Sequence, residues 1–433
     1  MAQYRKDTHQ YLPDGKTIFE VVMLADQYGN QVGPANPTGM AVDAFGRARV
    51  STPLTLFDSQ HRYDPNGKFH TANTGGGTYS FDANSAAYSM IVNTSSGAEV
   101  IRETRRVFAY QPGKSLQILQ TFVMNPAKEG LRQRVGYFDT RNGIFLELDG
   151  STLSFVKRSN STSTPTDTPV EQADWNYDKL DGAGPSGLTL DITKAQIMFI
   201  DIEWLGLGTV RCGFVINGQL IHCHSFHHAN IVDGPYMTTA CLPVRLEITN
   251  TDTTANNSTL KQVCSSVVSE GGYELRGKPI SIGTPANSII NMATAGIWYP
   301  IVSIRLKADQ LDSIVIPTNI SFLAEGNNGR AKYALISGGT LGGNTVFTSA
   351  ASDSPVEYNM VANSISGGTV VQQGLVGITN QSSALISLDK DALFKYQLSR
   401  NGLTNTPEVL TLAGMAGTAG DDASGTIDWE EVI

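Results

Sequence analysis

Residues Gln196–Phe226, QIMFIDIEWLGLGTVRCGFVINGQLIHCHSF, decide the fold class. In the segment QIMFIDI the apolar residues that suit a core recur at every second position, which is the period of a β-strand. Asn217-Gly218 separates two further apolar segments, and this dipeptide is the favoured two-residue hairpin turn because both positions require positive φ. The sequence therefore predicts three consecutive antiparallel strands.

The hairpin turn also predicts the register of the last two strands. One face of the hairpin then pairs Phe214 with Ile221 and Cys212 with Cys223, and this apolar face suits a core. The opposite face pairs Gly213 with His222 and places Arg211 opposite His224. We interpret this polar face as a contact with another subunit.

The composition of the 433 residues excludes several classes of protein. The net charge is −9 and no Lys/Arg-rich run occurs, so we expect no nucleic-acid partner. No apolar run is long enough to cross a membrane, and the first residues, MAQYRKDTHQYLPDGK, lack the apolar segment of a secretory signal. Four cysteines are too few for a disulfide scaffold, so we expect buried thiols in a chain made in the cytoplasm.

Turn residues divide the chain into three parts. Residues 1–50 are interrupted by Gly and Pro every few positions and are predicted to form an extended N-terminal arm that is stable only against another surface. Residues 51–278 contain many short strands, and their order resembles the concanavalin-like jelly roll of two stacked antiparallel sheets. Residues 279–433 follow a Gly- and Pro-rich link and predict a second, smaller β-sandwich. The fold class expected is therefore all-β.

Three stretches resemble structural proteins of tailed bacteriophages, especially those of marine phages and cyanophages. These stretches are Asp43–Asp58 (DAFGRARVSTPLTLFD), Arg106–Ser115 (RVFAYQPGKS) and residues 135–226. The resemblance implies a virion component that is made in the host cytoplasm. As its place on the particle we consider a tail or baseplate fibre, a neck appendage for host attachment, or a capsid-surface decoration.

The segment Phe199-Ile-Asp201-Ile-Glu203 raises the possibility of a glycan-cleaving enzyme. It resembles the catalytic strand of jelly-roll glucanases, where acidic residues at alternate positions point into one cleft. The position that matches the nucleophile of that family holds Phe199, whose ring cannot form a covalent glycosyl intermediate. Asp201 and Glu203 are then ordinary polar residues that face solvent or pair with a neighbour such as Arg211. We predict no catalytic residue and no enzyme activity.

Histidines cluster at the end of the predicted hairpin. His222 and His224 would share a face of one strand, and His227 or His228 could supply a third ligand to zinc or nickel. Arg211 opposite His224 would repel a cation, so the alternative is a set of subunit contacts. We predict no bound metal and no cofactor.

The long polar loop Arg158–Gly187 is the third candidate site, since loops of this length are usually functional. Its central residues have the chemistry of glycan-binding loops: Trp175, Asn176, Tyr177 and Asp178. The same aromatics would equally serve to fix the loop to the domain. The main prediction is therefore a non-enzymatic virion subunit that contacts other virion proteins and forms a homo-oligomer, for which we expect a trimer, and the alternative is a lectin-like protein that binds a host surface glycan.

Overall fold

The computed structural model describes residues 52–65, 67–326, 329–378 and 396–432, and the backbone of a few short strands outside these ranges. Those strands are β1 (His9–Tyr11), β2 (Ile18–Glu20), β3 (Leu24–Ala25), β4 (Gln31–Val32) and β30 (Ser383–Ser387). Residues 53–433 form one compact unit, separate from residues 1–52. The arm predicted over residues 1–50 lies outside the described residues except for β1–β4.

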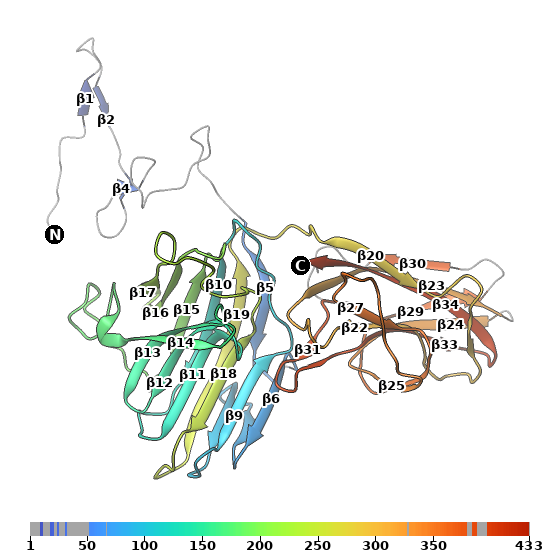
Figure 1. Cartoon of the computed structure of the whole chain (residues 1–433), viewed down its shortest axis with the longest axis horizontal. Helices are drawn as coiled ribbons and strands as arrows, with labels where there is room; N and C mark the ends of the chain where they lie inside the picture. Colours follow the sequence, from blue (N-terminus) through green and yellow to red (C-terminus); the bar gives the residue numbers. More distant parts are fainter. Residues whose placement is uncertain are drawn as a thin grey trace. The chain divides into compact units, whose positions relative to one another are not determined.

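The first sandwich pairs an eight-stranded sheet with a seven-stranded sheet (Figure 1). Neighbouring strands of the eight-stranded sheet are, in order, β17 (Gln219–Phe226), β16 (Val210–Ile216), β15 (Gln196–Ile202), β10 (Leu116–Val123), β19 (Ser258–Ser269), β8 (Ala87–Val92) and β7 (Thr78–Asp82), and β5 (Leu54–Gln60) also pairs with β19. The seven-stranded sheet has the order β14 (Thr166–Glu171), β13 (Thr152–Ser159), β12 (Gly143–Asp149), β11 (Leu131–Phe138), β18 (Val244–Asn250), β9 (Glu99–Thr104) and β6 (Phe69–Thr74). All pairings between these strands are antiparallel, as the jelly roll requires.

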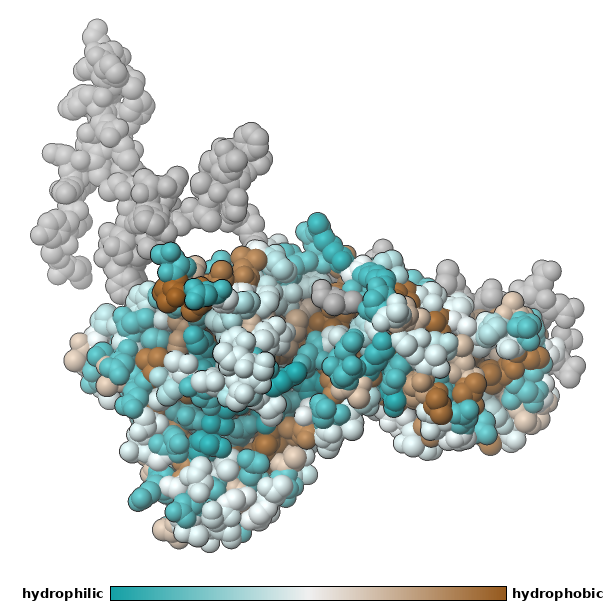
Figure 2. Space-filling view, viewed as in Figure 1, coloured by the Kyte–Doolittle hydropathy of each residue, from teal (hydrophilic) through white to brown (hydrophobic). Residues whose placement is uncertain are grey.

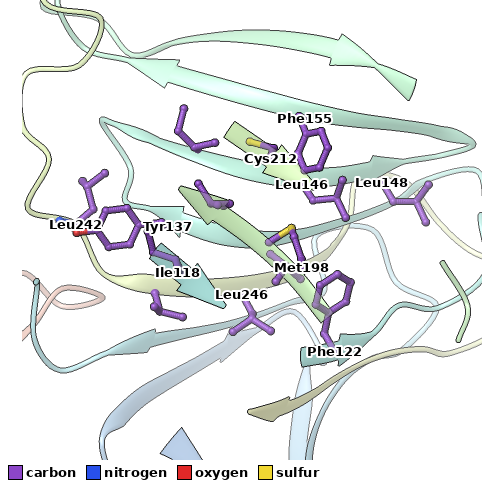
Figure 3. Close-up of a cluster of buried hydrophobic side chains, with 14 of the residues drawn as sticks. Ile118, Phe122, Tyr137, Leu146, Leu148, Phe155, Met198, Cys212, Leu242 and Leu246 are labelled. Carbon is purple, nitrogen blue, oxygen red and sulfur yellow. Dashed lines mark hydrogen bonds between the residues drawn. The ribbon is translucent and has the colours of Figure 1, made fainter. Parts of the chain in front are cut away.

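Alternate side chains of the two sheets meet in one apolar core (Figure 3). Met198 and Cys212 from one sheet and Leu146 and Leu246 from the other are all fully buried. Core residues at every second strand position confirm the alternation predicted for QIMFIDI, because Met198, Ile200 and Ile202 all lie inside.

The second sandwich is built from the strands after β19. Its five-stranded sheet contains β20 (Lys278–Gly283), β34 (Asp421–Val432), β23 (Ile314–Glu325) and β30 in this order, and β21 (Ile290–Met292) pairs with β34. Its six-stranded sheet has the order β26 (Thr348–Ser349), β27 (Val356–Asn359), β22 (Tyr299–Leu306), β33 (Leu410–Ala416), β24 (Gly329–Ser337) and β29 (Thr369–Ile378). A small sheet of β25 (Thr340–Gly343) and β28 (Ala362–Ser366) and a pair of two-residue strands, β31 (Arg400–Asn401) and β32 (Thr406–Pro407), complete it. The strands change from one sandwich to the other beside the predicted boundary at residue 278, but both sandwiches belong to one compact unit, so the division into domains stays a prediction.

The acidic end of the chain is a strand inside this sandwich. In β34, buried and half-buried residues alternate over all twelve positions, and the strand lies between β20 and β23. Its Glu431 carboxylate is buried and accepts hydrogen bonds from Ser354 Oγ and from Trp429 Nε1. The alternation of acidic and apolar residues at this end is therefore that of a strand in the sheet, with the buried carboxylate of Glu431 hydrogen-bonded.

The hairpin of β16 and β17 has the predicted turn and one unpredicted irregularity. Asn217 and Gly218 have φ of 53° and 76°, and Phe214 pairs with Ile221 as expected. A β-bulge between Cys212 and Gly213 shifts the register, so Cys212 pairs with His224 and Arg211 pairs with Ser225. The predicted pairs Cys212–Cys223 and Arg211–His224 are therefore wrong, because a bulge places two residues opposite one. All four cysteines are free thiols, and Cys212 and Cys223 are buried.

No helix among the described residues is long and apolar enough to cross a membrane. One short 3-10 turn, Gln172–Asp174, is the regular helical element of the described residues, which makes the chain all-β in class.

Candidate functional site

Three of the four loop residues predicted to bind a glycan have roles inside the protein. Trp175 is 1% exposed, and its ring lies against Phe155 and Phe214 at centroid distances of 4.7 and 6.3 Å. A buried indole presents no face to a ligand, so Trp175 fixes the loop to the core. Asp178 is also buried and accepts hydrogen bonds of 2.8 Å from the backbone N–H groups of Leu180 and Ser186.

Asn176 covers the free edge of strand β17. Its side-chain amide donates to Ser225 O and its side-chain carbonyl accepts from Ser225 N, both at 2.9 Å. The backbone N–H of Tyr177 donates to Cys223 O at 3.0 Å. The amide side chain thus replaces a neighbouring strand at an edge that would otherwise be open to other chains.

Tyr177 is the exposed aromatic residue of this group, with 50% of its surface accessible. Its ring stacks on His222 with centroids 4.1 Å apart, on the outer face of the eight-stranded sheet. Ile197 and Leu220 add exposed apolar area on this sheet, and Leu220 pairs with Val215 of the neighbouring strand. The structure therefore presents an exposed aromatic ring at Tyr177, while Trp175 and Asp178 are buried.

The predicted histidines point in different directions. His222 Nε2 lies 2.8 Å from Ser225 Oγ, whereas His224 is buried with its ring edge-on to Phe226. The His228 ring stacks on Tyr236 at 3.8 Å, and its Nδ1 lies 2.7 Å from Gly208 O. His227 is exposed on the other side of this turn.

The environment of His222, His224 and His228 favours their neutral form. Burial lowers the pKa of His224 and of His228 to about 4, and burial also lowers the pKa of His222. Within the described residues, no group of three or more His, Cys, Asp or Glu side chains is arranged to hold a metal ion. The histidines thus pack and accept or donate hydrogen bonds within the sandwich.

The two acidic residues of the predicted catalytic strand lie at the end of β15. Asp201 lies in β15 opposite Arg211, with 3.8 Å between Oδ2 and Nη1, and Glu203 follows the last residue of that strand. The Phe199 ring covers Gly213, where a side chain would collide with it. Burial raises the pKa of Asp201 while Arg211 opposes this. The pairing of Asp201 with Arg211 is the one expected for an ordinary polar strand face.

The largest concentration of buried charge lies elsewhere, on the outer face of the seven-stranded sheet. Arg134 of β11 contacts Glu147 of β12 at 2.5 Å and Glu247 of β18 at 3.3 Å, and Arg158 of β13 contacts Asp167 of β14 at 2.8 Å. Figure 2 shows hydrophilic side chains gathered over this part of the first sandwich. These arginines also cover the fully buried ring of Phe145. We call this set of ion pairs the charged ladder.

The charged ladder continues to the place where the two sandwiches meet. Arg245 of β18 contacts Glu247 at 2.7 Å and Glu103 at 2.6 Å, and Glu103 also contacts Arg400 of the second sandwich at 2.7 Å. Next to them is a cleft of about 490 Å³. Charged residues from both sandwiches line it: Glu103, Asp139, Arg141, Arg245, Asp309, Asp312 and Arg400. Arg141 and Asp312 form an ion pair across it.

The chemistry of the charged ladder suits rigidity better than acid–base catalysis. Burial raises the pKa of Glu247, but Arg245 and Arg134 outweigh it, so the pKa is lowered. The pKa of Asp167 is lowered in the same way by Arg158 and Arg134. A general acid needs the opposite shift, because it must hold a proton near neutral pH. These carboxylates remain ionised and paired.

The segment Arg106–Ser115, which carries part of the resemblance to phage proteins, forms the join between the sandwiches. Phe108 and Tyr110 belong to the core of the first sandwich. Val107 and Ala109 point the other way and pack against Ile314 and Ile316 of β23 in a separate apolar cluster, which we call the junction cluster. Around it, Glu408 contacts Arg105 at 2.7 Å and His70 at 2.9 Å.

The sequence around strand β9 contains a signal for the charged ladder, although the candidate sites predicted above do not include it. In Ala98–Phe108 (AEVIRETRRVF) charged residues occur on both strand faces, which favours a solvated strand or a contact with a partner chain. Instead, Arg102 and Glu103 are each 2% exposed, on opposite faces of β9. Arg102 lies inside the sandwich over the Tyr88 ring, 3.7 Å from its centroid, and burial lowers its pKa to about 10. Charges on both faces of one strand thus marked the place where a second layer packs on the sheet.

Comparisons with known proteins give weak likenesses over about half of the chain. No protein-family model and no curated protein matches the chain. A solved protein of unknown function from Shewanella oneidensis MR-1 is 10% identical with a TM-score of 0.35, covering 53% of this chain and 91% of that one. A carbohydrate esterase of the Shiga toxin-encoding bacteriophage phi24B is 11% identical with a TM-score of 0.32, covering 51% and 100%. Peanut lectin is 11% identical with a TM-score of 0.28, covering 51% and 98%. Likenesses of this size carry no conclusion about activity or ligand.

Proposed function

We propose that this chain is a non-enzymatic structural subunit of a tailed-phage virion that works as a homo-oligomer. The observation that carries the proposal is that the segment Arg106–Ser115 lies at the join between the two sandwiches. Its residues resemble a phage structural motif, and in this chain they join two β-sandwiches through the junction cluster and the Glu408 ion pairs. A motif used for joining two bodies supports a mechanical role.

The charged ladder supports the same proposal. Ion pairs that are mostly buried hold six strands of one sheet and one residue of the second sandwich in a fixed geometry. Buried, paired charges favour a single arrangement of the parts over alternatives. The pKa values of Glu247 and Asp167 are lowered by their arginine partners, which is opposite to the shift that a general acid needs and supports a role other than glycan cleavage.

Locating the chain on the particle tests the proposal. Gold labelling of a tagged chain on purified virions, seen by negative-stain electron microscopy, distinguishes a tail or baseplate fibre, a neck appendage and a capsid-surface decoration. Particles that lack the chain altogether would contradict the proposal. As mechanism, we propose that residues 1–50 anchor the subunit to a neighbour, so deleting residues 1–40 should abolish incorporation and leave the thermal unfolding of the sandwiches unchanged. Normal incorporation of the truncated chain would refute the anchoring role.

A host-glycan-binding role is the second candidate, and the exposed Tyr177–His222 stack favours it. Aromatic faces of this kind bind the apolar faces of sugar rings. Glycan-array binding should then be lost in Tyr177→Ala and kept in Tyr63→Ala, which removes a tyrosine that is 78% exposed elsewhere. Equal binding by both variants, or none by the natural chain, would exclude this platform.

A further inference from the structure

Strand β29 forms one edge of the six-stranded sheet of the second sandwich and is unusual in composition. It pairs with β24, and no other described strand pairs with it. Its ten residues, TVVQQGLVGI, contain no charge and no proline, and Val370, Val371 and Leu375 are 42%, 37% and 63% exposed. Figure 2 shows hydrophobic surface on the second sandwich. An edge strand of this kind is a template for pairing with another chain.

Other edge strands of this protein carry features that discourage such pairing. Strand β14 contains Asp167, Pro169 and Glu171, and β20 begins with Lys278-Pro279. Strand β17 is covered by Asn176. Charges, prolines and covering groups are the usual protections of sheet edges. In β29 the one such feature is a β-bulge at Val371, and it leaves Gln372–Ile378 in regular pairing.

The regular part of β29 has a well-defined face. Gln373, Leu375 and Gly377 are exposed, whereas Val376 and Ile378 between and beside them are buried. Gly374 lies against the Tyr333 ring, where a side chain would collide with it. The strand is therefore held on the sandwich with Leu375 at the middle of the segment Gln372–Ile378.

We propose that β29 pairs antiparallel with β29 of a second copy of this chain, about a two-fold axis at Leu375. This register uses the whole regular segment: Leu375 faces its counterpart, and Gln373 faces Gly377. An uncharged strand pairs with itself without repulsion between like charges, and the two leucines bury each other as a cross-strand pair. The inference rests on the homo-oligomer of the proposed function and names its contact. Because the contact is two-fold, it makes a dimer the unit of assembly, which light scattering distinguishes from the trimer expected above.

The test uses the full chain and four variants. Multi-angle light scattering of the natural chain should give a dimer, and Leu375→Lys should raise the dimer Kd by at least about tenfold, because two ammonium groups then face each other. Val361→Lys is the matched control, since Val361 is 58% exposed on the same sandwich outside β29. An equimolar mixture of Leu375→Lys and Leu375→Glu should dimerise again. Oxidised Leu375→Cys should run as a disulfide-linked dimer, which the natural chain with its four cysteines should not.

Three results would overturn the inference. A natural chain that is monomeric at all concentrations, an oligomer that Leu375→Lys does not weaken, or a Lys/Glu mixture that stays dissociated each excludes self-pairing at Leu375. Labelling on the virion tests the proposed function independently of this contact. If the chain is found on the particle but Leu375→Lys leaves its oligomer unchanged, the β29 contact is refuted and the proposed function stands.

Discussion

At the scale of single residues, Glu103 connects the charged ladder to the second sandwich. Its carboxylate is 2% exposed and accepts from Arg245 Nη1 and Arg400 Nη1. We predict that Glu103→Ala lowers the free energy of unfolding by about 3–5 kcal/mol, since it leaves two buried guanidinium groups without their common partner. Urea unfolding measures this loss. Glu171→Ala, at an exposed position of the same sheet, should change the midpoint little, and an equal effect of both variants would contradict the role of Glu103.

Protonation of His228 should make the free energy of unfolding depend on pH, and the direction of this dependence can be predicted. Burial lowers its pKa to about 4 in the folded chain, whereas an unfolded histidine titrates near pH 6.5. The unfolded state therefore binds more protons between these values, so the contribution of His228 is complete above about pH 6.5 and is lost as the pH falls toward 4. In an NMR titration the His228 ring should remain neutral at pH 5.5, where a histidine of the unfolded chain is mostly protonated. A His228 midpoint near 6.5 would contradict the buried, stacked geometry.

At the scale of elements, the hairpin shows what local sequence can and cannot predict. Asn217-Gly218 determined the turn and the first four cross-strand pairs, because turn geometry acts over a few residues. The bulge lies between Cys212 and Gly213, where the opposite strand contributes the buried residues Cys223 and His224, and no local sequence pattern encodes it. The apolar face was therefore predicted correctly and the polar register beyond the bulge was not.

The candidate site was less predictable than the fold for a similar reason. Trp175 and Asn176 have the chemistry of a glycan-binding loop. In the folded loop, however, Trp175 fills the core and Asn176 covers the edge of β17. The members of the charged ladder lie on β9, β11, β12, β13, β14 and β18, up to about half of the jelly roll apart in sequence. These residues come together because of the order of the strands in the sheet. Neither the composition of the sequence nor the spacing of its residues specifies that order.

The covering of strand β17 by Asn176 gives a prediction at the element scale. Asn176→Ala removes two hydrogen bonds to Ser225 and should cost about 1–2 kcal/mol of unfolding free energy. It should also speed hydrogen exchange at the Ser225 amide, because Asn176 Oδ1 is the acceptor of that N–H. Asn257→Ala, at an exposed loop asparagine, is the control. Unchanged exchange at Ser225 would show that the loop protects the edge by other means.

At the scale of the whole molecule, two sandwiches are joined by an apolar cluster with ion pairs around it. The junction cluster contains Val107 and Ala109 from the first sandwich and Ile314 and Ile316 from the second. Two hydrogen bonds to backbone carbonyl groups also cross the join. Arg400 N donates to Arg105 O at 2.9 Å, and Gln397 Nε2 donates to Val107 O at 2.9 Å. Because apolar burial and buried charge both cross the join, the two sandwiches should unfold together.

Breaking the junction cluster should separate the two unfolding events. Ile314 is 1% exposed, so Ile314→Asp places an unpaired carboxylate in the cluster, at a cost of about 3–5 kcal/mol. Scanning calorimetry should show one transition for the natural chain and two for this variant, because each sandwich keeps its own core. Val361→Asp introduces the same group at an exposed position and should keep a single transition. If Ile314→Asp also unfolds in one transition with an unchanged midpoint, the cluster does not couple the sandwiches, and the segment Arg106–Ser115 loses the mechanical role on which the proposed function depends.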